Sequence, residues 1–394
     1  MAKRDVFRSR AIEAIDAAKN DLLTLSHDIH EYREVAFEEV QSSTRLRNIL
    51  SDHGFRIKDV EGLPTAFIAE IGSGSPVIAV MAEYDALPKM GHACGHNIIA
   101  SAAVGAGLGI SSFIGESEGT VRVIGTPAEE GGGGKVIMVD KGVFDDVDVA
   151  MIVHPAGEYM ADDCSLAIRS MDVEFTGKAA HAASGPQFGI NALSAAVEFI
   201  VSINAFREHM TNDGRIHAII TNGGTAVNII PEQTEVRVAV RATKGAYLDE
   251  LIEQVERRAQ GVSLATGCKY SISKVGLGCR EIHVNPELSR LFEDNFKSLG
   301  VTVVPRGDSM GSTDVGNVSH VVPTIQAYVG VGVEALHTPE FREASISPRG
   351  DEAVINGAKV MALTAADILS DDSVLAKIRG ETPGRSSDVS VVFP

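Results

Sequence analysis

The 394-residue chain contains no tryptophan, few aromatic residues and only four cysteines. Those cysteines lie too far apart for the disulfide framework of a small secreted domain, at Cys94, Cys164, Cys268 and Cys279. The N-terminal stretch lacks the apolar core of a secretory signal, and we identify no run of about 18 apolar residues. We therefore expect a cytoplasmic protein with free thiols and no membrane partner.

Basic residues are also scarce. The chain carries 35 lysines and arginines against 53 acidic residues, a formal net charge of −18. A field of that sign repels phosphate backbones, so we expect no nucleic-acid partner. The chain is longer than a domain with a single ordinary hydrophobic core, which predicts two domains, or one large α/β domain with an insertion.

The first part of the chain alternates between helical and strand-like patterns. Apolar residues recur at three- and four-residue steps from 12 to 29, which predicts an opening helix, and a second helix is expected at 39–53. Short apolar runs, separated by helical stretches, then predict the strands of a mostly buried α/β sheet, at 65–71, 76–82, 120–125 and 148–154.

The pattern changes near residue 167. From there to about residue 280 the order of predicted elements is β-α-β-β-α-β, which is typical of a ferredoxin-like domain. We therefore predict an α/β catalytic domain in two parts, 1–166 and 281–394, with residues 167–280 inserted between them. The terminal stretch from residue 379 is expected to be a loosely held end.

Polar residues follow four of the apolar runs, at the points where the predicted strands end. In an open α/β sheet, ligands collect beyond the carboxyl ends of the strands, so these residues are expected to share one crevice. The four groups are Glu83 and Asp85 with the Cys94 loop, Glu129 with Glu130, His154, and His337.

The loop "EYDALPKMGHACGHN" has the composition of a metal site. In an extended loop Cys94 and His96 point the same way, whereas on a helix they would diverge by about 200°. Thiolate, imidazole and carboxylate together favour zinc, with manganese or cobalt as alternatives. A glycine-flanked loop with solvent-facing histidines is the plain alternative, but it leaves the other three clusters unexplained.

The adjacent Glu129 and Glu130 need different roles. We assign Glu130 to a cation and Glu129 to general base catalysis, because hydrolysis needs a group that receives the proton of the attacking water. The following "GGGGK" is not a phosphate-binding loop, since Val136 stands where serine or threonine is required. Cys94 as a nucleophile would leave the glutamate pair and His154 without a role.

Taken together, these motifs resemble the co-catalytic metallopeptidases that include aminoacylases and auxin-conjugate amidohydrolases. The resemblance runs from about residue 20 to residue 370 and is closest to the branch of p-aminobenzoyl-glutamate hydrolase. Asn97 departs from the auxin-conjugate pattern and agrees with that branch. The matching motifs are "EYDALPKMGHACGHN", "GTPAEEGGGGK", "VHP", "GKAAHAA", "NIIP", "GSTDVGNVS" and "LHTP".

The resemblance implies two divalent cations, zinc or manganese, in each subunit. Cys94 would bridge them, Glu129 would be the general acid and base, and Asp85 would orient the site. The remaining ligands implied are His96, Glu130, His154 and His337. Whether Glu83 or His92 contacts the metals stays open.

The resemblance also implies that the inserted domain is a lid and forms a homodimer. His181 would reach the active site of the partner subunit and hold the substrate carbonyl oxygen. Asn228, Ser312 and Thr313 would contact the substrate carboxylate, although turn formation explains these three residues nearly as well.

We therefore predict a metal-dependent amidohydrolase. Its expected substrate is a small N-acyl amino acid, an aroyl-glutamate-like conjugate or an unusual dipeptide. Three alternatives stay open: a dipeptidase or carboxypeptidase acting on peptide ends, a catalytically silent binding protein of the same fold, and a thiol or redox protein built on Cys94.

Overall fold

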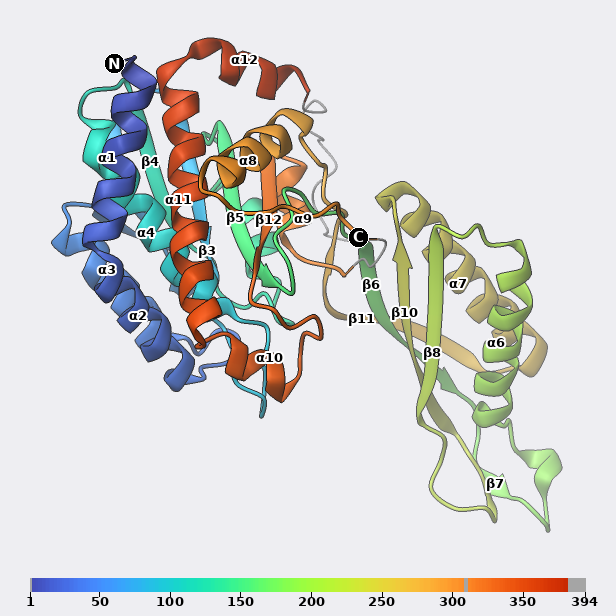
Figure 1. Ribbon diagram of the computed structural model, residues 1–394. Coiled ribbons are helices and arrows are strands. Elements are labelled where there is room, and N and C mark those ends of the chain that lie inside the picture. Colours follow the sequence, from blue (N-terminus) through green and yellow to red (C-terminus); the bar gives the residue numbers. More distant parts are fainter. Residues whose placement is uncertain (1, 308–310, 382–394) are drawn as a thin grey trace. The chain divides into compact units, whose positions relative to one another are not determined.

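The computed structural model describes residues 2–307 and 311–381, which divide into two units (Figure 1). The first unit contains the described residues within 1–164, 282–310 and 314–394, and the second contains 165–281 and 311–313. The sequence placed the corresponding boundaries at 166/167 and 280/281. From residue 382 on, the expected loose terminus lies outside the described residues.

The first unit is built on a six-stranded sheet in the order β1-β2-β4-β3-β5-β12. Strands β4, β3, β5 and β12 are parallel to one another. Strand β2 pairs antiparallel with β4, and β1 pairs antiparallel with β2. The carboxyl ends of the four parallel strands therefore lie at one edge of the sheet. The strands span Arg56–Val60 (β1), Leu63–Ser73 (β2), Val77–Ala82 (β3), Gly119–Gly125 (β4), Val149–Ala156 (β5) and Thr324–Gly330 (β12).

Both faces of this sheet are covered. Successive side chains of a strand point to opposite faces, and every residue of β3 is buried. Ile78 and Val80 belong to the core that contains α4 and α11, and Ala79 and Met81 to the core that contains α5 and α9. The helices of the first unit span Lys3–Ala17 (α1), Lys19–Tyr32 (α2), Val40–Asp52 (α3), His96–Ile114 (α4), Gly134–Asp140 (α5), Pro286–Ser298 (α8), Val315–Ser319 (α9), Pro339–Ala344 (α10), Pro348–Ser370 (α11) and Asp372–Gly380 (α12).

The opening helix differs from the prediction, because two helices replace one. The break falls at Ala18, where ψ is 0°. The apolar spacing continues across the break, so nothing in the pattern marks it. The bend allows Ile15 and Leu22 to pack into the same core.

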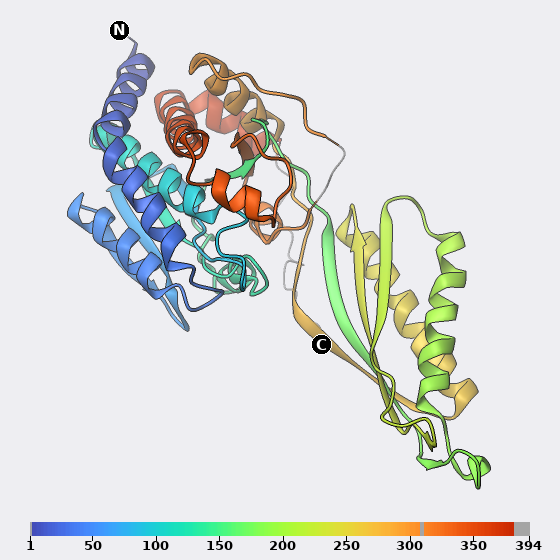
Figure 2. The ribbon, with the colours of Figure 1, turned by 60° about the horizontal axis from the view of Figure 1, so that its bottom comes forward.

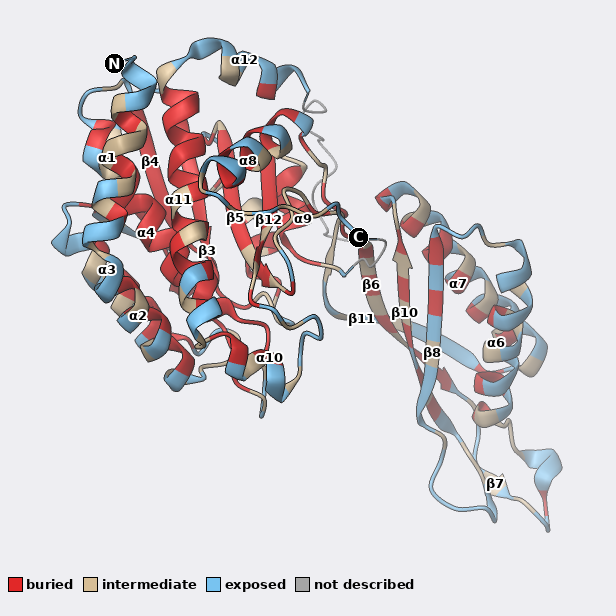
Figure 3. Ribbon diagram, viewed as in Figure 1, coloured by how far each residue is buried: buried red, intermediate tan, exposed pale blue. Residues whose placement is uncertain are grey.

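Two helices, α4 and α11, have the length and composition of a membrane span. The expectation that the chain holds no such stretch is therefore wrong for these helices, whose alanines and glycines interrupt the larger apolar residues. Of the apolar window, 89% is buried in α4 and 83% in α11. Figure 3 shows both as core helices of the first unit.

The second unit has the predicted order β6-α6-β8-β10-α7-β11, and the two-domain α/β fold with an inserted β-α-β-β-α-β domain is confirmed. Its sheet is antiparallel in the order β11-β6-β10-β8, and both helices cover one face (Figure 2). A short pair, β7 and β9, forms a separate two-stranded antiparallel sheet. The elements span Ala167–Thr176 (β6), Ala180–His181 (β7), Ala192–Phe206 (α6), Gly214–Asn222 (β8), Ile229–Ile230 (β9), Gln233–Ala242 (β10), Gly245–Thr266 (α7) and Lys269–Cys279 (β11).

Candidate metal centre

The four predicted polar clusters meet at one edge of the six-stranded sheet. Glu83 and Asp85 follow β3, and Glu129 and Glu130 follow β4. His154 lies near the end of β5, and His337 follows β12. They converge because the four strands are parallel and their carboxyl ends share that edge.

His154 faces Cys94 with one defined nitrogen. Its Nδ1 lies 2.8 Å from the carbonyl oxygen of Pro155, which can only accept, so Nδ1 carries the proton. Its Nε2 lies 3.4 Å from Cys94 Sγ. Burial lowers the pKa of His154 to about 4. The neutral ring therefore directs a lone pair toward the Cys94 sulfur.

Asp85 orients two ligand candidates at once. Its Oδ1 lies 3.0 Å from His96 Nδ1, and its Oδ2 accepts a hydrogen bond of 2.9 Å from the backbone N–H of Glu130. His96 begins α4, directly after Gly95, whose φ of 77° is left-handed. A carboxylate on one ring nitrogen of a histidine is the usual partner of a metal ligand, since it directs the other nitrogen to the metal.

His337 is held by its backbone. Its φ is 59°, and its N–H donates to the carbonyl oxygen of Ala93, which ties it to the Cys94 loop. Its Nε2 lies 3.2 Å from Glu130 Oε1 without forming a hydrogen bond. The side chain is half exposed, so the centre opens to solvent on this side.

The potential ligand atoms form two groups that share Cys94. One group is Cys94, His96 and His154, and the other is Cys94, Glu130 and His337. Within each group the ligand atoms lie within 4.8 Å of one another. The structure thus brings all five predicted ligands together, with the cysteine between the two groups.

Two buried atoms of this cluster lack hydrogen-bond partners among the described residues. They are His96 Nε2 and Glu130 Oε1. A buried polar atom without a partner is unfavourable unless something else satisfies it. Both atoms point into the cluster and belong to residue types that bind zinc or manganese, so the donor set fits divalent cations.

The electrostatics of the cluster also fit cations. Burial raises the pKa of the Cys94 thiol. Burial opposes protonation of His96, but the charges of Asp85 and Cys94 outweigh it and raise the pKa of the imidazole well above its ordinary value. A cation would compete with both protons, since only the thiolate and the free nitrogen are ligands.

Glu129 stands beside the ligands. It forms a third group with His96 and Glu130, again within 4.8 Å. Burial raises its pKa well above the ordinary value, and the negative charges of Glu83 and Asp314 add to the effect. A carboxyl group with a raised pKa holds a proton well, which suits a general acid and base.

A fully buried lysine near the centre was missed by the sequence analysis. Lys135 Nζ lies 2.6 Å from Glu83 Oε1 and 2.7 Å from Asp314 Oδ1. The backbone N–H of Lys135 also donates to Asp314 Oδ2. Glu83 Oε2 in turn lies 3.4 Å from His96 Nε2. In the sequence, Lys135 stood out only as the end of a failed phosphate-binding motif. Its position among the apolar residues of "KVIMV" was the available signal for a buried cation.

The other sequence candidates lie in the second unit or away from the ligands. His181 and Asn228 lie together at the β7–β9 pair, where the N–H of Ala182 donates to the carbonyl oxygen of Asn228. Ser312 Oγ lies 3.4 Å from Arg241 Nη1, and Thr313 is buried. His92 is buried beside His30 and belongs to neither ligand group.

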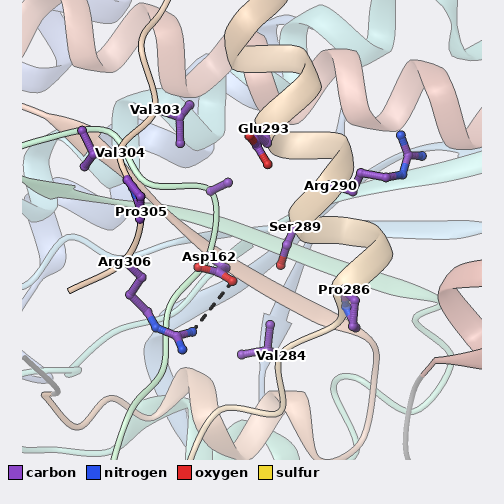
Figure 4. A pocket seen from close by; sticks show the side chains of 11 residues that line it. Asp162, Val284, Pro286, Ser289, Arg290, Glu293, Val303, Val304, Pro305 and Arg306 are labelled. Atoms are coloured by element: carbon purple, nitrogen blue, oxygen red, sulfur yellow. Dashed lines mark ion pairs between the residues drawn. The ribbon is translucent and has the colours of Figure 1, made fainter. Parts of the chain in front are cut away.

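A cavity of about 520 Å³ in the first unit is separate from the metal centre (Figure 4). It lies between α8 and the segment that contains residues 303–306, and Arg306 and Asp162 face each other across it at 3.8 Å. Its lining includes none of the ligand candidates.

Comparisons with known proteins give one family. Residues 167–265 match the model of the peptidase dimerisation domain. The chain is 36% identical over 400 residues to Xaa-Arg dipeptidase of Mus musculus, covering 96% of this chain and 93% of the relative. It is also 36% identical over 276 residues to one of the two p-aminobenzoyl-glutamate hydrolase subunits of Escherichia coli, covering 64% and 57%.

Among solved structures, a dinuclear metal-binding peptidase of the M20 family from Bacillus subtilis has the same fold. The TM-score is 0.72 at 23% identity, and the match covers 90% of this chain and 99% of that one.

Proposed function

The chain belongs to the M20 family of metal-dependent peptidases and amidohydrolases, which act on amide bonds, and from this premise we propose that it is a dinuclear dipeptidase. One observation carries the proposal: two groups of ligand atoms share Cys94 at the sheet edge, with Glu129 beside them. We further propose zinc or manganese as the cations.

The ligands would divide between two cations. Cys94, His96 and His154 would hold the first, and Cys94, Glu130 and His337 the second. When bound, the cations supply positive charge that acidifies water and polarises the substrate carbonyl group. Asp85 keeps His96 and Glu130 in place through its two oxygens.

Glu129 is the proton carrier. It accepts the proton of the attacking water and returns it to the departing amine, so that one carboxyl group serves both halves of the reaction. Burial, together with the negative charges of Glu83 and Asp314, raises the pKa of Glu129, so the carboxylate takes up a proton readily.

His181 is suited to donate a hydrogen bond to a carbonyl oxygen. Its Nδ1 accepts from the N–H groups of Ala183 and Ser184, both at 3.2 Å. The proton of the neutral ring therefore sits on Nε2, and the side chain is exposed. We propose that this N–H stabilises the negative charge that develops on the substrate oxygen in the partner's site, with Asn228 close by.

The relatives support a dipeptide substrate. At equal identity, the match to Xaa-Arg dipeptidase spans 96% of the chain, against 64% for the p-aminobenzoyl-glutamate hydrolase relative. We propose a dipeptide with a basic C-terminal residue as the first substrate to test, and an aroyl-glutamate as the second.

A homodimer formed by the second unit and a cytoplasmic location complete the proposal. Strand β8 is at the sheet edge and exposes Ile219, while α6 exposes Val197 and Val201. The dimerisation-domain match supports pairing through this unit. The four free thiols suit a reducing compartment.

The test is amine release by metal-free enzyme supplied with zinc or manganese. The panel contains Xaa-Arg dipeptides, p-aminobenzoyl-glutamate and N-acetyl amino acids. We expect metal-dependent release, fastest with the dipeptides. Glu129→Gln should abolish turnover while its metal content, measured by mass spectrometry, stays near wild type.

Three results would contradict parts of this proposal. No release from any substrate by protein that holds two metals per chain would favour a silent binding protein. Activity that survives chelation would favour thiol chemistry at Cys94. Loss of metal from Glu129→Gln would mean that the two glutamates share or exchange their roles.

A further inference from the structure

Glu39 is a buried carboxylate that the proposed reaction does not use. It lies at the N-cap of α3 and is 0% exposed. Its side chain makes no hydrogen bond to the N-terminus of its own helix. Glu34 takes that role instead, because its carboxylate accepts from the N–H groups of Gln41 and Ser42. The Glu39 carboxylate is therefore directed elsewhere.

The partner of Glu39 is the residue directly before the catalytic pair. Its Oε1 accepts two backbone hydrogen bonds of 2.9 Å, from Ala128 and from Phe37. Its Oε2 accepts a hydrogen bond of 2.9 Å from Thr65 Oγ1. One oxygen thus ties two segments together, and the other is anchored to β2.

Both of the tied residues have unfavourable backbone conformations. Ala128 has φ 61° and Phe37 has φ 63°, a left-handed region that residues with a Cβ atom avoid. Such a conformation persists only where its surroundings hold it. The conformation of Ala128 sets the direction in which the chain leaves β4 and enters Glu129 and Glu130.

The surrounding loop packs against the same point. A Cβ atom at Gly132 would lie 2.5 Å from Ala128 Cβ and 2.6 Å from the Phe37 ring, so the loop passes directly over both. The carbonyl oxygen of Ala128 accepts from the N–H of Gly132. Ala128 is therefore the centre of the turn that carries the two glutamates.

We propose that Glu39 is a positioning residue, which holds Ala128 in its left-handed conformation and so directs Glu129 toward the attacking water and Glu130 toward the metal. The inference rests on the roles proposed above for these two glutamates. Burial raises the pKa of Glu39 to about 7, and Asp85 adds to the effect. A glutamine would keep the accepting Oε1 without the cost of a buried charge.

The test compares four variants of the full-length enzyme. We expect Glu39→Ala to lower kcat by about 10- to 100-fold with KM within about twofold, and to weaken cobalt(II) binding by about tenfold. Cobalt binding is read from visible absorption during titration of metal-free protein, which needs no turnover. Glu39→Gln should retain near wild-type values in both measurements.

Ala128→Gly in the Glu39→Ala background separates positioning from general stability. Glycine adopts a positive φ without the Cβ penalty, so it should restore at least part of kcat and of cobalt affinity. Thr65→Val is the matched control: it removes the donor to Oε2, leaves Ala128 tied, and should change both readouts by less than about twofold.

Wild-type kcat and cobalt affinity in Glu39→Ala would overturn the inference, as would equal losses in Thr65→Val. Failure of Ala128→Gly to restore either quantity would mean that Glu39 does not act through residue 128. If Glu39→Ala does not fold, Glu39→Asp replaces it, because its shorter side chain cannot reach both N–H groups. If the wild type hydrolyses no amide, the proposed function fails, and the cobalt titrations still decide the role of Glu39.

Discussion

Individual hydrogen bonds decide which atoms of the centre are available for a metal. Asp85 occupies Nδ1 of His96, and the Pro155 carbonyl occupies Nδ1 of His154. In both rings Nε2 remains and faces the cluster. The choice between nitrogens follows from the acceptor that each ring can reach, which is the carbonyl group of the next residue for His154 and the Asp85 carboxylate of the preceding loop for His96.

The buried carboxyl group of Asp163 predicts how the stability of the protein depends on pH. Burial raises its pKa to about 6, and its Oδ2 accepts from Gln326 Nε2 at 2.9 Å. Because the folded pKa exceeds the unfolded value near 3.9, its contribution to stability is present at low pH and is lost as pH rises through 6. The asparagine of Asp163→Asn does not ionise, so the stability of this variant does not fall with pH for this reason.

The free energy of unfolding in urea, measured for both proteins at pH 5 and pH 8, tests this. The advantage of Asp163→Asn over wild type should grow by about 1 kcal/mol between the two pH values. Asp172→Asn is the control: Arg237 lowers the pKa of Asp172, so its effect should not change over this range. A constant difference for Asp163→Asn would contradict the raised pKa.

Between elements, close helix packing depends on small residues. A Cβ atom at Gly105 of α4 would lie 2.8 Å from Ala358 Cβ of α11 and 2.8 Å from Leu22 Cδ1 of α2. Three helices thus meet at one glycine. The helical spacing of "NIIASAAVGAGLGISSFI" predicted α4 but not which of its glycines touches another helix.

Gly105→Val should lower the free energy of unfolding by about 2 kcal/mol, because the core has no space for the added carbons. Gly261→Val, at an exposed position inside α7, serves as the control, since no atom lies within 4 Å of a Cβ atom there. Chemical denaturation of both variants measures the difference. Equal losses at the two positions would show that helix propensity, rather than packing, controls the effect.

For the whole molecule, the proposed dimer predicts the effect of a charge on the exposed face of α6. Val201, which is 59% exposed, would lie in the interface. Val201→Glu should shift the mass measured by light scattering from twice 41.6 kDa toward 41.6 kDa. Turnover by the Val201→Glu variant should fall as the dimer dissociates, because His181 is proposed to act in the partner's site.

Leu277→Glu, on the opposite edge strand β11, is the matched control and should leave the mass unchanged. A wild-type protein with the mass of one chain would contradict the dimer. Full turnover by a monomeric Val201→Glu variant would contradict the proposed role of His181.

The sequence by itself determined the α/β class, the inserted β-α-β-β-α-β unit and a set of ligand candidates at the strand ends. These depend on residue type and on periodicity, which are local properties of the chain. The break at Ala18 was not predictable, because the apolar spacing runs through it unchanged. The roles of the ligands and of Glu129 stay predictions for the experiments above.

Only the tertiary structure decided how the centre is supported. Lys135 meets Asp314 across 179 positions of sequence, and Glu39 meets Ala128 across 89. Buried polar groups must find partners wherever the fold places them, and no local pattern specifies a partner so distant. The residues that carry the chemistry, and Asp85 beside them, are therefore visible in motifs, while the distant supports Glu39 and Lys135 appear only once the chain is folded.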